Sequence, residues 1–314
     1  MTHSLTIDGN AFQTQETFDV INPSTGDVVA TCPLGTVSAL DAAVAAARRA
    51  FPGWAARPDA ERRDSLGKIA DLIEAHQAEL AALITAEQGK PQIGPGAPFE
   101  IGGCIAWTRV TQGLSIEPEV LIDTDRERVE LIREPVGVVA SITPWNWPLM
   151  IAIWHIMPVL RVGCTVVMKP SPYTPLSTLR LVQLITDADI LPPGVLNVVT
   201  GAADVGDRIS SHPDIDKIAF TGSTATGQRI MERAGSSLKR LTLELGGNDA
   251  GIILPGMDMN VARRLVAGTR WVNRHGVLNP TVPMGGVKKS GIGVEFGLDG
   301  RREYTTVQVL SIAK

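Results

Sequence analysis

The chain has 314 residues, a length that predicts two units, and its 44% hydrophobic and 20% charged residues are typical of a soluble globular protein. Its net charge of -4 and the lack of a basic stripe argue against nucleic acid as a partner. No apolar run reaches the roughly 18 residues of a membrane span, and the first residues are polar. We therefore expect a cytoplasmic protein without membrane contact.

The N-terminal part predicts two short strands over residues 17–32, followed by an alanine-rich helix that Ser38 or Asp41 would cap. Further along, apolar residues recur at helical spacing and predict one helix over residues 61–87. Gly89 is expected to end this helix.

Residues 116–135 have a different character, since two polar-alternating strands flank a charged turn. A single hairpin is marginally stable in water and usually pairs with another sheet. We interpret this segment as an arm, with oligomerisation as its expected role.

From residue 136 the sequence alternates between strands and helices. The strands are rich in Val and Ile and almost continuously apolar, as strands buried on both faces are. Helical stretches separate them, which predicts an α/β fold with a parallel sheet. The expected strands are 136–142, 164–170, 194–200, 217–223 and 250–254, and the helices between them include 173–187 and 224–234.

In such a sheet, ligands bind at the carboxyl ends of the strands. The first expected strand ends in TPWNWP, where the amide of Asn146 could donate to a developing oxyanion or simply complete a turn. Lys169 leaves the second strand and could hold ribose hydroxyls or phosphate.

Two further motifs leave a ligand role and a structural role open. Glycines in FTGSTATG precede a helix, where backbone N–H groups can approach a phosphate, although the motif is neither GxGxxG nor a Walker loop. Glu244 lies in the apolar run LELGG. A buried carboxylate has either a hydrogen-bond partner or a raised pKa, and a raised pKa suits a general base.

Taken in order, the motifs resemble the NAD(P)-dependent aldehyde dehydrogenase superfamily over nearly the whole chain. The matching stretches are ITPWNWP, VMKPS, LPPGVLNVVTG, IAFTGSTATG, LTLELGG, WVNRHG, PMGGVKKSGIGVEFG and YTTVQVL. The resemblance implies a Rossmann-like parallel sheet with flanking helices, a β-hairpin arm, and a remnant of the catalytic domain. It also implies NAD or NADP as cofactor, a small-molecule aldehyde as substrate, and a homo-oligomer that is a dimer or a tetramer.

The resemblance also assigns roles to single residues. Asn146 would donate to the thiohemiacetal oxyanion, Glu244 would activate the hydrolytic water, and Lys169 would hold the adenosine ribose. The implied cofactor-binding residues are Thr143, Pro144, Trp145, Lys169, Ser171, Gly222, Ser223, Thr226 and Leu245. The implied division is a dinucleotide-binding domain (1–115 and 136–258), an oligomerisation arm (116–135 and 301–314) and a catalytic-domain remnant (259–300).

One family feature is missing. The catalytic cysteine of the family lies after the LELGG motif, but here DMNVA passes directly into RRLVAGTRWVN, a junction that can continue as a helix over 259–267. The cysteines present, Cys32, Cys104 and Cys164, fit neither the nucleophile nor a metal or disulfide pattern. We therefore expect little or no aldehyde oxidation, the alternatives being an NAD(P)-binding pseudoenzyme or a structural, oligomerising subunit.

A smaller departure concerns the choice of cofactor. Pro172 stands where NAD-preferring relatives carry a glutamate for the ribose diol. A proline side chain cannot accept those hydrogen bonds, so use of NADP, or of both cofactors, becomes more plausible.

Overall fold

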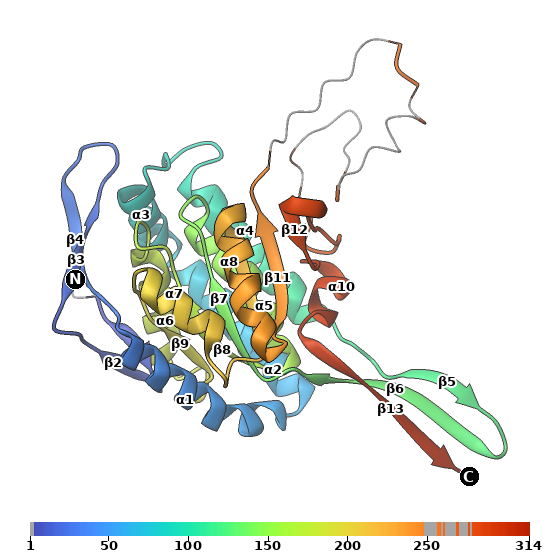
Figure 1. The fold of residues 1–314 in the computed structure, drawn as a ribbon. Coiled ribbons are helices and arrows are strands. Elements are labelled where there is room, and N and C mark those ends of the chain that lie inside the picture. The colour runs from blue at the N-terminus through green and yellow to red at the C-terminus, as the bar shows by residue number, and fades with distance from the viewer. Residues whose placement is uncertain (1–2, 248–255, 259, 261–267, 270–275, 277) are drawn as a thin grey trace.

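A computed structural model describes residues 3–247, 256–258, 260, 268–269, 276 and 278–314 (Figure 1). Among these residues, the main sheet has eight strands in the order β12-β11-β10-β7-β8-β9-β1-β2. The middle five are parallel: β11 (Arg240–Leu245), β10 (Lys217–Gly222), β7 (Val138–Ile142), β8 (Thr165–Lys169) and β9 (Leu196–Val198). Antiparallel strands extend both sides: β12 (Gly291–Ile292), β1 (Leu5–Ile7) and β2 (Asn10–Phe12). The predicted α/β class is confirmed.

The strands that were predicted from their apolar character are found with slightly shorter bounds. β7, β8, β9 and β10 occupy the stretches predicted at 136–142, 164–170, 194–200 and 217–223. The strand predicted at 250–254 lies outside the described residues. β11 was missed as a strand, because two charged residues, Arg240 and Glu244, interrupt its apolar pattern.

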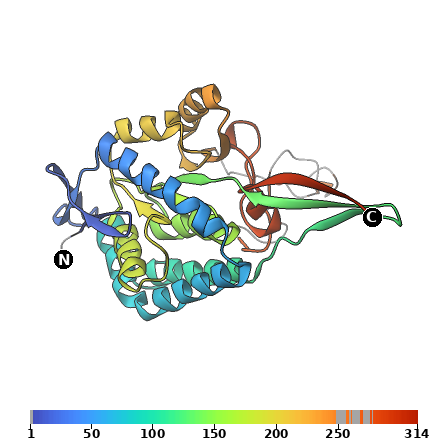
Figure 2. The same cartoon turned by 90° about the horizontal axis from the view of Figure 1, so that it is seen from below.

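Helices cover both faces of this sheet (Figure 2). On one face lie α1 (Val37–Ala55), α7 (Ala203–Ser211) and α8 (Thr224–Ala234). On the other lie α5 (Pro148–Val162) and α6 (Leu176–Asp187), with α2 (Asp59–Ala75), α3 (Gln77–Gln88) and α4 (Ala97–Gly113) packed outside them. The core is therefore the sheet between these layers. Among the described residues, no helix combines the length and the apolar character needed to cross a membrane.

Two predictions about the N-terminal helices are wrong. The cap of α1 is Thr36, whose hydroxyl accepts from Ala39 N at 3.2 Å, and is neither Ser38 nor Asp41. The single helix predicted over 61–87 is two helices, α2 and α3, because His76 leaves the helical conformation between them. The apolar stripe continues across this break, so its spacing did not reveal it. Gly89 ends α3 in the left-handed conformation, as predicted.

Two smaller sheets complete the fold. β3 (Thr17–Ile21) and β4 (Val28–Pro33) pair within the region predicted as short strands. β5 (Glu119–Asp123), β6 (Glu127–Pro135) and β13 (Thr305–Ala313) form an antiparallel sheet that projects away from the body (Figure 1). The predicted hairpin is thus present with a third strand, whereas its role in oligomerisation stays a prediction. The C-terminal part also contains α10 (Gly297–Arg302) and two short 3-10 helices, η1 (Gly235–Ser237) and η2 (Lys288–Ser290).

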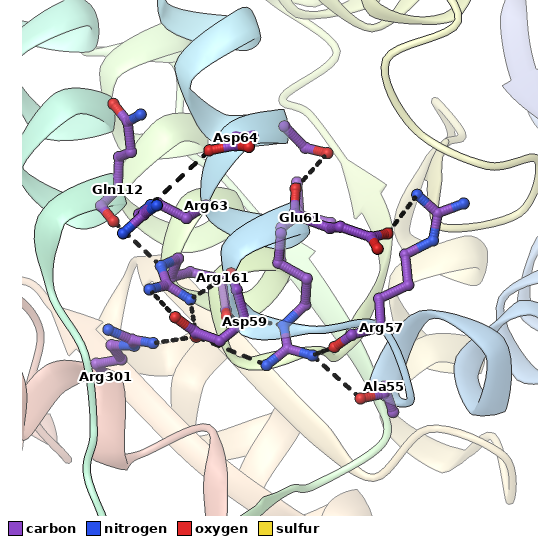
Figure 3. A network of polar contacts seen from close by, with 12 residues as sticks. Ala55, Arg57, Asp59, Glu61, Arg63, Asp64, Gln112, Arg161 and Arg301 are labelled. Carbon is purple, nitrogen blue, oxygen red and sulfur yellow. Dashed lines mark hydrogen bonds and ion pairs between the residues drawn. The ribbon is translucent and has the colours of Figure 1, made fainter.

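The foot of this arm is tied to the body by a cluster of charges around Asp59, the first residue of α2 (Figure 3). Arg161 of α5 binds both carboxylate oxygens, with its Nη2 2.7 Å from Oδ2. Arg62 and Arg301 lie 3.7 and 3.9 Å from the same carboxylate. The hydrogen bond from Arg161 is the main cause that lowers the pKa of Asp59. Because Arg301 belongs to α10, the cluster joins α2, α5 and the segment leading into β13.

Candidate functional site

Every residue of the predicted site lies at one edge of the sheet, because β8, β7, β10 and β11 are parallel neighbours and the residues follow or end these strands. The strand register places Ile142 beside Lys169, and Thr221 beside Glu244. The chain order reverses between β7 and β10, the topological switch point where such sheets bind ligands.

The loop from Thr143 to Trp147 leads from β7 into α5 and presents the Asn146 side chain, which is exposed. Two contacts connect this loop to the β8–α6 segment. Thr143 N donates to the Lys169 carbonyl at 3.2 Å, and the Thr174 hydroxyl lies 3.5 Å from the Trp145 carbonyl. The amide of Asn146 therefore stands on a backbone that is held to the neighbouring strand.

The N-terminus of α8 forms the second part of the site. Ser223 caps this helix, since its hydroxyl accepts from Thr226 N at 3.2 Å and donates to Thr226 Oγ1 at 2.9 Å. A Cβ on Gly227 would lie 2.4 Å from Leu245 Cδ2, so a larger residue here would require the Leu245 side chain to move. The first turn of α8 thus offers backbone N–H groups and a positive dipole end, which suit a phosphate.

Lys169, the last residue of β8, is almost fully buried, with 8% of its surface exposed. Burial lowers the pKa of its ammonium group to about 8, and the carboxylate of Asp204 only partly opposes this shift. Within the described part of the chain, no acceptor lies in hydrogen-bond contact with Lys169 Nζ. The lysine is therefore able to donate to a ligand hydroxyl or phosphate.

Glu244, near the end of β11, is half-buried. Burial is the main cause that raises the pKa of its carboxyl group to about 8, and the nearby Glu295 adds to the rise. Among the residues that the structure describes, no hydrogen-bond partner contacts the buried oxygen Oε1. Glu244 is therefore mostly protonated at neutral pH and becomes a competent base as the pH approaches 8.

Two buried residues near Glu244, His155 and Glu295, were not predicted as site residues from the sequence. Glu295 Oε1 lies 3.0 Å from Nε2 of His155, and Nδ1 of His155 lies 2.9 Å from the Ser141 hydroxyl. Each was visible as a polar residue inside a stretch of apolar residues and glycines: His155 in IAIWHIMPVL and Glu295 in GVEFG. Nothing in the sequence alone indicated that these two residues would lie in contact near the carboxyl group of Glu244.

All three cysteines of the chain are described, and all are buried. Burial raises the thiol pKa of Cys32 and of Cys164 to about 12, and that of Cys104 well above its ordinary value. Cys164 precedes β8 at the amino edge of the sheet, opposite the site, and its Sγ donates to the Tyr304 carbonyl at 3.4 Å. None of the three thiols is therefore exposed at the candidate site. Among the described residues there is also no cluster of three potential metal ligands.

A family model and several known proteins match most of this chain. The model of the aldehyde dehydrogenase family matches the chain in two segments, residues 11–264 and 259–310. The phenylacetaldehyde dehydrogenase of Pseudomonas fluorescens is 41% identical over 280 residues, which cover 84% of this chain and 54% of that protein. The NADP/NAD-dependent aldehyde dehydrogenase PuuC of Escherichia coli is 40% identical over 276 residues, covering 81% and 55%. The chain thus spans about half the length of the curated relatives it matches.

Solved structures agree with this fold. The NAD+ complex of an aldehyde dehydrogenase from Bacillus cereus aligns with a TM-score of 0.94 at 27% identity, over 100% of this chain and 97% of that one. The two segments matched by the family model meet at 259–264, where the sequence predicts the junction. The helix predicted there, over 259–267, falls outside the described residues apart from Asn260.

Proposed function

The chain belongs to the aldehyde dehydrogenase family, and we propose that it binds NAD or NADP at the carboxyl edge of its sheet but has little or no aldehyde-oxidising activity of its own. One contrast supports both halves of the proposal. The groups suited to a dinucleotide are gathered at the switch point, whereas all three thiols are buried and none is exposed there.

The arrangement at the edge fits a dinucleotide. The N-terminus of α8, with Gly222, Ser223 and Thr226, would receive the pyrophosphate. Lys169 would hold the adenosine ribose, and Ser171 follows it in the same loop. The cleft between these groups would be lined by Thr143, Pro144, Trp145 and Leu245. A bound nicotinamide cofactor would supply hydride acceptance.

The substrate side is incomplete in this chain. Asn146 would donate its amide to an oxygen that develops negative charge, and Glu244 would accept a proton from water. Covalent attack on an aldehyde needs a thiolate, because a thiol is a poor nucleophile. The buried Cys32, Cys104 and Cys164 do not supply one near neutral pH.

For the choice of cofactor, we propose NADP or dual use. Pro172 is exposed in the loop after Lys169 and places no carboxylate beside an adenosine ribose. A 2'-phosphate would therefore meet no fixed negative charge from this position. The PuuC relative is named an NADP/NAD-dependent enzyme, which is consistent with dual use.

The test combines calorimetric titration of NAD and NADP with an assay of reduced cofactor, using protein of verified mass and aldehydes that include phenylacetaldehyde. We expect measurable binding and no turnover. Lys169→Met should weaken binding roughly tenfold, since a charge-assisted hydrogen bond is lost. The exposed Lys68 on α2 provides the matched control, Lys68→Met, which should bind normally. Steady turnover would refute the proposed inactivity, and a flat titration at millimolar cofactor would refute the binding.

The arm favours a second candidate function, that of an oligomerising subunit. Its sheet exposes large apolar side chains on two of its strands: Val120, Leu121, Ile122, Val307, Val309, Leu310 and Ile312. Exposed apolar patches on strands favour association. We propose that residues 116–135 and 301–314 form an oligomerisation arm, which sedimentation velocity over a range of protein concentrations would test.

A further inference from the structure

The two helices that follow the site loops begin without a capping side chain of their own. The N-cap residue of α5 is Trp147 and that of α6 is Pro175, and neither provides a side-chain hydrogen bond to its helix. Buried carboxylates from the outer helical layer take this place. Glu100 of α4 caps α5, and Glu87 of α3 caps α6.

The Glu100 side chain is fully buried. Its Oε1 accepts hydrogen bonds from the backbone N–H groups of Leu149 and Met150, both at 3.0 Å. Its Oε2 accepts from Lys90 Nζ at 2.5 Å. The same ammonium group lies 3.3 Å from the centroid of the Trp147 ring. Glu100 and Lys90 therefore contact the residue after Asn146 and the first turn of the helix that follows it.

We propose that Glu100, assisted by Lys90, is a positioning residue that sets the direction of the Asn146 amide, an inference that rests on the oxyanion role proposed for Asn146. A carboxylate that accepts two N–H bonds at a helix N-terminus forms charge-assisted bonds and meets the positive end of the dipole. Because the group is buried, a neutral replacement forms weaker bonds to those N–H groups and leaves Lys90 without its counter-ion, so the first turn must shift or open. Asn146, two residues before Pro148, moves with it.

Glu87 provides a matched comparison within the same chain. It is 2% exposed and accepts from Leu176 N at 2.5 Å, from Ser177 N at 3.1 Å and from the Ser177 hydroxyl at 2.5 Å. It therefore supports α6 and the loop after Lys169, which carries Ser171. The two glutamates share burial and capping chemistry but serve different loops, so a general loss of stability and a local effect on Asn146 can be told apart.

The experiment uses the full chain, deuterated and prepared both with 15N-asparagine and with uniform 15N labelling, and the Asn146 side-chain signal is assigned by its loss in Asn146→Asp. In Glu100→Gln we expect this signal to shift, and the amides of Leu149 and Met150 to exchange roughly tenfold faster. In Glu87→Gln the Asn146 signal should shift less, because the Thr174 contact reaches only the Trp145 carbonyl, while Leu176 and Ser177 exchange faster. An unchanged Asn146 signal in Glu100→Gln, or an equal shift in both variants, would overturn the proposal.

Lys90→Met is the second variant, and it covers the case in which Glu100→Gln does not fold. It leaves the carboxylate cap in place but removes the cation from Glu100 and from the Trp147 ring, so a smaller shift of the Asn146 signal in the same direction is expected. A lack of any shift in this variant would count against the positioning role. Addition of phenylacetaldehyde to the unmodified protein tests the oxyanion role separately. If the Asn146 signal does not respond, that role fails, while the ligand-free spectra still decide whether Glu100 positions the amide.

Discussion

The parallel sheet carries charged side chains at both edges, but the hydrogen-bond partners of these side chains differ between the two edges. At the amino edge, Lys217 Nζ donates to Thr242 Oγ1 at 2.8 Å and lies 3.3 Å from Glu303. Asp216, beside it, accepts from Val138 N at 2.7 Å and from Arg48 at 2.8 Å. At the carboxyl edge, Lys169 is nearly as buried as Lys217, but no described residue accepts a hydrogen bond from its ammonium group.

The contrast separates polar groups that stabilise the fold from polar groups that are available to a ligand. Burial of a charge costs several kcal/mol unless partners offset it. The amino edge supplies these partners within the chain. Burial lowers the pKa of Lys217 as well, but Glu303 opposes that shift with both its charge and a hydrogen bond. At the carboxyl edge the pKa values are shifted to about 8 for Lys169 and about 8 for Glu244, a pattern typical of functional sites.

The largest expected effect concerns thiols, since the only cysteine next to a central strand, Cys164, is at the amino edge. A thiol pKa near 12 leaves ~1000-fold less thiolate than the ordinary value of 9.0. We expect a thiol reagent at pH 8 to label the folded protein slower than the unfolded protein by about this factor. Rapid labelling of one cysteine in the folded protein would contradict this and would identify a reactive thiol. Replacement of each cysteine by serine would then show which one reacts.

The next effect compares the two edges directly. Lys217→Met should lower the free energy of unfolding by about 3 kcal/mol, because Glu303 and Thr242 lose their buried partner. Lys169→Met should change it by less than ~1 kcal/mol, or raise it, because a desolvated ammonium group is removed. Urea unfolding of both variants measures the difference. Equal losses would show that Lys169 is a structural lysine and not a ligand group.

The pH dependence of stability provides a smaller effect. The folded pKa of Glu244 is about 8, against an ordinary value of 4.5, so between these values the folded state holds a proton that the unfolded state has lost. Stability should therefore fall as the pH rises from about 5 to about 8. Glu244→Gln should recover ~1–2 kcal/mol at pH 8.5, an amount reduced by solvent screening of this half-buried group.

Glu87 contributes to the same pH dependence, because burial raises its pKa to about 7. Part of the decline with pH should therefore persist in Glu244→Gln. The exposed Glu61→Gln is the control and should leave the curve unchanged. A curve for Glu244→Gln that overlays the unmodified protein would show that Glu244 is ionised at neutral pH.

Much of the fold could be predicted because local sequence patterns report burial. Strands buried on both faces are continuously apolar, so β7, β8, β9 and β10 were found, and with them the edge that carries Asn146 and Lys169. The break at His76 was missed because two helices in phase show the same stripe as one. Contacts between distant segments were also missed. Glu100 and the Leu149 amide are 49 residues apart, and no local pattern connects them.

The smallest expected effect concerns the arm, which belongs to neither edge. Val309 is 62% exposed on β13, so Val309→Lys should change the stability of the folded chain by no more than ~0.5 kcal/mol. If the arm associates, the same variant should shift sedimentation toward smaller species, because a buried lysine opposes an apolar interface. Ser236→Lys, an exposed position on η1 outside the arm, adds the same charge as a control. Identical sedimentation of both variants and the unmodified protein would leave the arm without a role in association. The exposed apolar strands would then need another partner.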